Sequence, residues 1–213
     1  MPRPVAAVAG LATVLTYNTW LAAQPLFEHT GVLAGYLSEL SAADQPHHLF
    51  FRIGDMLTGL LVAILALSVH SASRHRPGGT AGRRWRRLVA VGLLVFAVAT
   101  ILDAVFVLDC APSHDVACHA AERQGQLSAS HYIHEVTSVS AQLGATGSLV
   151  AGIMAVRPRR WWLLGLGAVH VLALAVMMIM LGAGLSGIGY LQAVTVFTAS
   201  LWFAAVGLGV LDR

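Results

Sequence analysis

Long apolar runs alternate with short polar segments along this chain. Six runs hold about 20 residues each, the length that a helix needs to cross the hydrocarbon core of a bilayer. We therefore expect an all-α integral membrane protein, a bundle of six transmembrane helices forming a single domain over residues 1–213. The helices are predicted over residues 4–23, 49–71, 88–108, 131–156, 161–182 and 188–211.

Composition agrees with a membrane assignment and excludes one class of partner. Only 11% of the residues are charged and the mean hydropathy is +0.72, whereas a soluble domain carries roughly 25% charged residues. The pI of about 9.3 would also suit a nucleic-acid-binding protein. The arginines, however, lie in short segments between apolar runs, so we exclude nucleic acid and expect membrane lipids as the partners.

The placement of arginine predicts the orientation. Six arginines fall within residues 74–87 and three within residues 157–160, while Arg3 and Arg213 lie near the two chain ends. The remaining connecting segments hold only Arg123, with Arg52 at the start of the second helix. Because arginine-rich short loops stay on the cytoplasmic side, we expect a multi-pass cell-membrane protein with both termini in the cytoplasm.

Two polar segments, 24–48 and 109–130, then lie outside. In the first, Leu33, Leu37 and Leu40 follow a spacing of four and three residues, which predicts a short helix lying at the outer interface. A packed connecting loop is the alternative. The second segment holds Cys110 and Cys118, which we expect to form a structural disulfide because the compartment is oxidising. Their spacing differs from the Cys-x-x-Cys of redox sites.

Ionisable residues recur at one depth near the predicted outer surface. Asp55, Asp103 and the pair His134–Glu135 lie one to two turns inside their helices. A charge within the bilayer costs on the order of 2.5–3.5 kcal/mol, so these groups should face an interior cavity that opens outward. Helical spacing and depth add further polar residues to this layer: Tyr17, Asn18, Arg52, His131, Ser138, Gln142, Tyr190 and Gln192.

Two interpretations of this layer stay open. In the structural one, Arg52 neutralises Asp55 or Asp103, and the other groups form hydrogen bonds that join helices. In the functional one, Asp103, His131 and His134 bind a divalent metal, most simply zinc, and leave a fourth position open for water. Asp55 or Glu135 would then handle protons. The spacing His-x-x-His-Glu differs from the His-Glu-x-x-His of metalloproteases, so the motif by itself has little specificity.

Three stretches carry a resemblance to a known family. They are Tyr-Asn-Thr-Trp at 17–20, Gly-Tyr-Leu-Ser-Glu-Leu-Ser at 35–41, and Arg52-x-x-Asp55. Together they resemble the bacterial and archaeal membrane proteins grouped as domain of unknown function family 998, over nearly the whole chain. The resemblance implies a six-helix bundle and no settled activity.

A second likeness is chemical only. The alkaline ceramidase and adiponectin-receptor superfamily buries a zinc site of histidine, aspartate and serine among seven helices. Its His-x-x-x-His element is absent here, so no residue roles are transferred, and the likeness favours a lipid hydrolase by analogy alone.

Two functions follow as hypotheses. The first is an intramembrane metal-dependent hydrolase that acts on a lipid or lipid-linked substrate from the outer side. Arg52 would hold an anionic headgroup, and Tyr17, Asn18 and Ser138 would contact the substrate. The second is a non-enzymatic binding, sensing or transport-related protein that uses the polar outer cavity as a ligand site. Metal content discriminates between the two, because only the enzyme requires a bound ion.

Overall fold

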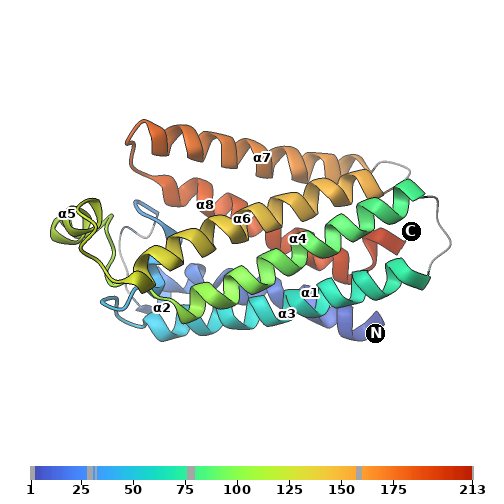
Figure 1. Cartoon of the computed structure of the whole chain (residues 1–213), viewed down its shortest axis with the longest axis horizontal. Coiled ribbons are helices and arrows are strands. Elements are labelled where there is room, and N and C mark those ends of the chain that lie inside the picture. Colours follow the sequence, from blue (N-terminus) through green and yellow to red (C-terminus); the bar gives the residue numbers. More distant parts are fainter. Residues whose placement is uncertain (1–2, 28–30, 32, 76–79, 157–159, 213) are drawn as a thin grey trace.

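The computed structural model describes residues 3–27, 31, 33–75, 80–156 and 160–212. Helices account for every regular element in this part of the chain, and no strand is present in it. Figure 1 shows the long helices running side by side, with the short helix α5 at one end of the bundle and both chain termini at the other. The long helices are α1 (Arg3–Thr16), α3 (His48–His75), α4 (Thr80–Val105), α6 (Ala129–Ala155), α7 (Trp161–Gly182) and α8 (Ile188–Gly207).

Five of these helices are long and apolar enough to cross a membrane, namely α3, α4, α6, α7 and α8. A sixth span results if α1 and the segment Thr19–Pro25, which are bent by 41° relative to one another, are counted as one. Many large apolar side chains point outward from the described helices, as lipid-facing helices require. The expectation of an α-helical membrane bundle is confirmed.

The bend in the first span falls at two polar residues. α1 ends at Thr16, and the 3₁₀ helix η1 (Thr19–Ala22) and the short helix α2 (Ala23–Phe27) follow. The Asn18 side chain donates from Nδ2 to the Val14 carbonyl at 2.9 Å and to Ser200 Oγ at 3.0 Å. A side-chain donor thus satisfies a carbonyl at the helix end and anchors the bend on α8.

Two predicted loops contain more helix than expected. α3 continues to His75 and α4 begins at Thr80, so most of the segment predicted as the 74–87 loop is helical. Arginine and alanine are good helix formers, and arginine can extend its head group to the interface without ending the helix. The polar segment 109–130 contains α5 (Val116–Arg123), whose N-terminus is capped by the Asp115 carboxylate.

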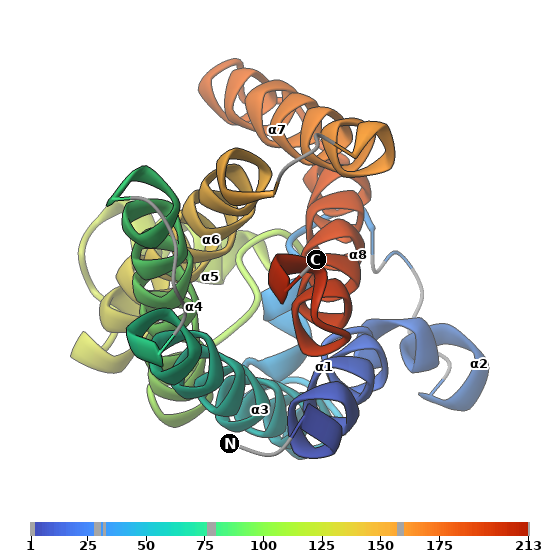
Figure 2. The same cartoon turned by 90° about the vertical axis from the view of Figure 1, so that its right-hand side faces the viewer.

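Small residues bring α4 and α6 together. A Cβ atom at Gly92 would lie 2.8 Å from the Gly144 carbonyl oxygen and 2.7 Å from the Ser148 amide nitrogen. Phe96, Trp202 and Phe203 fill the adjoining core, where the rings of Phe96 and Phe203 are 4.7 Å apart. Viewed from the end with the termini, α7 lies at the edge, against α6 and α8 (Figure 2).

The described parts of the polar segments 24–48 and 109–130 pack at the end of the bundle opposite the termini. The 3₁₀ helix η2 (Leu37–Ser41) buries Leu37 against α8, and Leu40 beside Phe51 of α3. A short helix is therefore present in the first segment, although its leucines point into the protein; its position at a membrane interface stays a prediction. The predicted disulfide is present between Cys110 and Cys118, whose Cα atoms are 6.1 Å apart, within the usual range for disulfides.

Candidate functional site

A polar cavity of about 80 Å³ lies inside the bundle, near the end that carries the disulfide. Its walls come from η1, η2, α3, α4, α6 and α8 and from Tyr17 at the bend of the first span. It brings together polar side chains that are far apart in the sequence: Tyr17, Thr19, Ser38, Asp55, Thr100, Asp103, Ser138, Gln142 and Gln192. Several residues of the predicted polar layer therefore share one cavity.

Asp103 accepts hydrogen bonds on both carboxylate oxygens. Ser138 Oγ donates to Oδ2 at 2.8 Å, and Thr137 Oγ1 donates to Oδ1. His134 Nδ1 is 3.7 Å from Oδ1. Ser138 and Thr137 are neighbours in α6, so this helix holds the carboxylate of α4 in one orientation at the cavity wall.

Asp55 also lines the cavity but has no ion pair or hydrogen bond to another described residue. Arg52, the cation three residues earlier in α3, points elsewhere. Its Nε and Nη2 donate to the Ala104 carbonyl at 3.1 and 2.9 Å, next to the end of α4. The arginine stabilises a helix C-terminus, and within the described residues it pairs with neither aspartate. The neutralisation by Arg52 considered from the sequence does not occur in this structure.

Thr100 adds a further polar group to this cavity. The residue is only 3% exposed, and its Oγ1 has no hydrogen-bond partner among the described residues. A buried hydroxyl without a partner costs about 1–3 kcal/mol. Because Thr100 lines the cavity, a ligand or water in the cavity could satisfy it.

His134 faces Asp103, with one ring nitrogen fully engaged. Nδ1 lies 2.9 Å from the Phe106 carbonyl and 3.2 Å from the Asp103 carbonyl. Carbonyls only accept hydrogen bonds, so we assign the proton to Nδ1. Nε2 is then a buried lone pair, and it has no partner among the described residues. A histidine that donates from one nitrogen to a carbonyl and offers the other has the arrangement of many metal ligands.

His131 faces a different set of residues. Its Nε2 lies 3.3 Å from Glu122 Oε1 and 3.9 Å from Glu135 Oε1. Glu122, His131 and Glu135 are the one group of metal-ligating side chains in the described part of the chain whose ligand atoms lie within 4.8 Å of one another. Glu122 was not predicted, because it lies on α5 in an outer segment, where no helical period relates it to α6.

The protonation of His131 fits poorly with metal binding. The backbone N–H of Asp109 donates to Nδ1 at 3.2 Å, so we assign the ring proton to Nε2, where it points at Glu122. A metal ion at that position would have to replace this proton. The predicted metal set Asp103, His131 and His134 stays a prediction, and its two histidines have separate partners here.

Tyr17 and Asn18 have different surroundings. Tyr17 lines the cavity and packs edge-on against Phe96, with ring centroids 5.2 Å apart. Asn18 is buried, and its Nδ2 donates the hydrogen bonds to Val14 and Ser200 described above. Its Oδ1 accepts a hydrogen bond from Trp20 Nε1 at 3.2 Å. Of the residues predicted to contact a substrate, Tyr17 and Ser138 are therefore at the cavity wall and Asn18 is not.

Glu39 is a buried acid outside the spanning helices, only 3% exposed. Its Oε1 accepts from the Ser113 N–H at 3.0 Å, and Oε2 is 3.8 Å from His114 Nε2. Burial raises the pKa of Glu39 above its ordinary value, although the Ser113 hydrogen bonds and His114 oppose the shift. This acid joins the first outer segment to the disulfide loop.

Glu39→Gln is expected to remove a pH dependence of stability. The pKa of Glu39 is higher in the folded state than in the unfolded state. Below the unfolded-state pKa the acid is neutral in both states and does not lower the free energy of unfolding. As pH rises through the folded-state pKa, the free energy of unfolding falls. The variant should therefore unfold at the same temperature as the wild type at acidic pH and at a higher temperature near neutrality, in thermal unfolding in detergent. Asp44→Asn, at an exposed position beside Gln45, is the control. A difference in unfolding temperature between the wild type and Glu39→Gln that does not change with pH would contradict this account.

Comparison with known proteins gives one finding. A family model described as "Protein of unknown function (DUF998)" matches residues 8–209, nearly the whole chain. The chain matches none of the curated proteins and none of the solved structures with which it was compared.

Proposed function

Because the chain belongs to this DUF998 family, whose description assigns no activity, we propose a function from the site: the protein binds a proton or a small cation in the polar cavity, at Asp55 and Asp103. It is a binding or transport-related membrane protein, with six spans, both termini in the cytoplasm and the cavity facing outward. The observation that carries the proposal is that two carboxylates line one small cavity while the nearest arginine points away.

Electrostatics supports an exchangeable positive charge. Asp103 has hydroxyl donors and a nearby histidine, but Asp55 has no cationic partner among the described residues. Leaving an ionised carboxylate unpaired in a poorly solvated site is costly. Protonation or a bound cation removes this cost, and the hydroxyl of Thr100 and the amide oxygen of Gln142 are further ligands for a hard cation.

The size of the cavity supports a small ligand. Pockets that hold drug-sized molecules have volumes of about 300–1,000 Å³, whereas this cavity has about 80 Å³. A few water molecules or one partly hydrated ion fit such a space. A lipid headgroup does not.

The proposed orientation of the chain in the membrane is based on the positions of the arginines and of the disulfide. The arginine-rich start of α4 and the start of α7, which Arg160 precedes, are at the same end of the bundle as both termini, and the disulfide is at the other. Arginine favours the cytoplasmic side and a disulfide favours an oxidising compartment. Both preferences therefore support an outward-facing cavity.

Infrared difference spectroscopy between acidic and alkaline pH tests the proposal on purified protein. Among the C=O bands of the carboxyl groups that titrate, we expect a component from Asp55, which Asp55→Asn should remove and the control Asp44→Asn should retain. Adding a cation that binds should shift the pH midpoint of the titration of this Asp55 component to lower pH, because the ion competes with the proton for the carboxylate. A spectrum of Asp55→Asn that equals the wild-type spectrum would refute the proposal.

A metal-dependent hydrolase that acts on lipid-linked substrates is the second proposal. It is favoured by the buried Nε2 of His134, which has no hydrogen-bond partner among the described residues. A zinc ion held there would activate water for attack near neutral pH. The chain's own groups would be Asp103, His131 and His134 as ligands, Asp55 and Glu135 for proton transfer, and Arg52, Tyr17, Asn18 and Ser138 for the substrate.

Elemental analysis separates the two proposals. The hydrolase should carry about one zinc ion per chain and lose it in His134→Ala. Metal-free, folded wild-type protein would leave the proton or cation site as the better account.

A further inference from the structure

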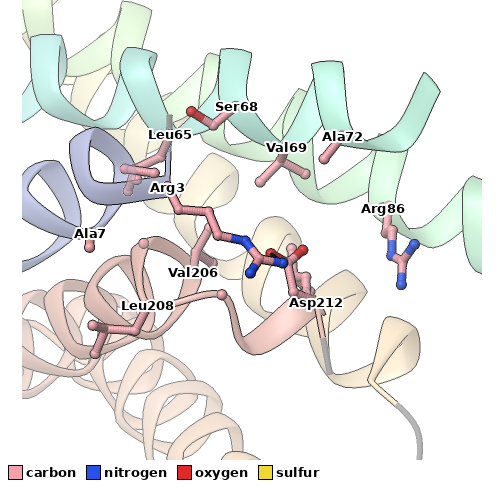
Figure 3. Close-up of a pocket in the computed structure, with 14 residues that line it drawn as sticks. Arg3, Ala7, Leu65, Ser68, Val69, Ala72, Arg86, Val206, Leu208 and Asp212 are labelled. Atoms are coloured by element: carbon pink, nitrogen blue, oxygen red, sulfur yellow. Dashed lines mark ion pairs between the residues drawn. The ribbon is translucent and has the colours of Figure 1, made fainter. Parts of the chain in front are cut away.

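A second, larger cavity lies at the other end of the bundle. It has a volume of about 410 Å³ and is enclosed by α1, α3, α4, α8 and the 3₁₀ helix η3 (Val210–Asp212). Figure 3 shows its apolar walls and, at its mouth, the side chains of Arg3, Asp212 and Arg86. This volume lies within the range of small-molecule sites, about 300–1,000 Å³.

We propose that this cavity binds one anionic phospholipid, with the phosphate between Arg3 and Arg86 and an acyl chain against the apolar walls. The site is separate from the carboxylate cavity, so the inference goes beyond the proposed function. That the lipid comes from the cytoplasmic leaflet depends on the chain orientation proposed above. That the cavity binds the lipid does not depend on the orientation.

The backbone around the cavity is held in place by close packing. A Cβ atom at Gly10 would lie 2.7 Å from the Phe203 carbonyl oxygen, and one at Gly207 would lie 3.0 Å from Gly10 Cα. After α8 ends, Gly209 has a φ of +80°, a left-handed conformation that glycine adopts without strain. The chain consequently turns back, and Asp212 reaches Arg3 at the start of α1.

The charges at the mouth favour an anion. Arg3 Nη2 lies 3.8 Å from Asp212 Oδ2, and the Arg3 side chain is 83% exposed. Such exposed pairs contribute little stability, so a phosphate can take the place of the carboxylate. Arg86 lines the same cavity and has no ion pair with any described residue. Among the described residues that line the cavity, two arginines and one aspartate leave an excess of positive charge, and the guanidinium group suits phosphate oxygens.

The walls favour a lipid over a soluble phosphate. Leu65 and Val69 lie within the membrane-spanning stretch His48–Ser73 of α3, and Val206 is in α8. Next to them, the outward face of α1 exposes Val8 and Leu11. Apolar walls at bilayer depth with arginines at the mouth match the two parts of a phospholipid, and basic pockets between helix ends are known to bind anionic headgroups.

Native mass spectrometry of the full chain in neutral detergent tests the inference. Phosphatidylglycerol should bind with one tight site per chain, and zwitterionic phosphatidylcholine should bind more weakly. Arg86→Gln is expected to lower the affinity for phosphatidylglycerol about fivefold. Asp212→Asn is expected to raise it, because the competing carboxylate is gone. Arg87→Gln, an exposed arginine of the same helix that does not line the cavity, is the matched control and should bind like the wild type.

Three results would overturn the inference. Equal losses in Arg86→Gln and Arg87→Gln would indicate general attraction to a basic surface. Equal binding of the two lipids would exclude recognition of the anionic headgroup. Displacement of the lipid by inorganic phosphate at an equal concentration would show that the site takes a soluble phosphate. Circular dichroism of each variant establishes that the fold is retained.

Discussion

Trp202→Ala should cause the largest loss of stability, about 3–5 kcal/mol from removing a fully buried aromatic side chain. Trp202 is 0% exposed and belongs to the main core with Leu149 and Phe203. Its Nε1 donates to Ser148 Oγ at 2.9 Å, and its ring lies against the backbone of Gly152. In a membrane the lost dispersion contacts dominate, since lipid is as apolar as the core.

Titration with sodium dodecyl sulfate, followed by circular dichroism, measures this loss of stability. Trp161→Ala is the matched control, because Trp161 is 82% exposed and its removal should change stability by less than about 0.5 kcal/mol. Trp202→Phe keeps most of the aromatic ring but loses the N–H donor to Ser148. It should therefore lose less stability than Trp202→Ala. Equal destabilisation by Trp202→Ala and Trp161→Ala would mean that the core does not determine stability.

Gly144→Ala should give the second largest effect, a destabilisation of about 1–3 kcal/mol from overpacking. The added Cβ would lie 2.8 Å from the Gly92 carbonyl oxygen and 3.0 Å from Phe96 Cα. Both are backbone atoms of α4, so no side chain can move aside and the helices must separate. Contacts between small residues hold membrane helices together, so such a separation weakens the bundle.

Gly147→Ala is the control for this prediction. Gly147 lies three residues further along α6, and a Cβ atom there would meet nothing within 4 Å. Alanine favours a helix over glycine by up to about 1 kcal/mol, so this variant should be neutral or slightly more stable than the wild type in the same titration. A Gly144→Ala protein as stable as Gly147→Ala would show that α4 and α6 are further apart than described.

Much of the fold could be predicted from the sequence. The apolar runs predict the spanning helices because a bilayer of fixed thickness requires about 20 apolar residues. Cys110 and Cys118 lie in a polar segment beyond one helix end, and the disulfide is present. The depth of Asp55 and Asp103 along their helices follows from a constant rise per residue, and both acids line the same cavity.

The partners of each polar side chain depend on tertiary structure. Neighbouring residues in a helix point about 100° apart, so the sequence alone predicts which residues share a face but not which neighbouring helix that face meets. His131 contacts Glu122 and Glu135, whereas His134, three residues later, contacts the end of α4. Hydrogen bonding requires heavy atoms within about 3.5 Å, and only the packed bundle determines distances of that size.

Arg52 is a further example. Its spacing from Asp55 predicts a shared face, yet its guanidinium donates to the Ala104 carbonyl on α4. The end of α4 presents carbonyls that have no partner within the helix, and α3 packs beside it, so the arginine binds them. Local periodicity and bilayer thickness therefore determined the helices and the depth of the acids. Helix packing alone decided that these acids line a cavity with no arginine among the described residues of its walls.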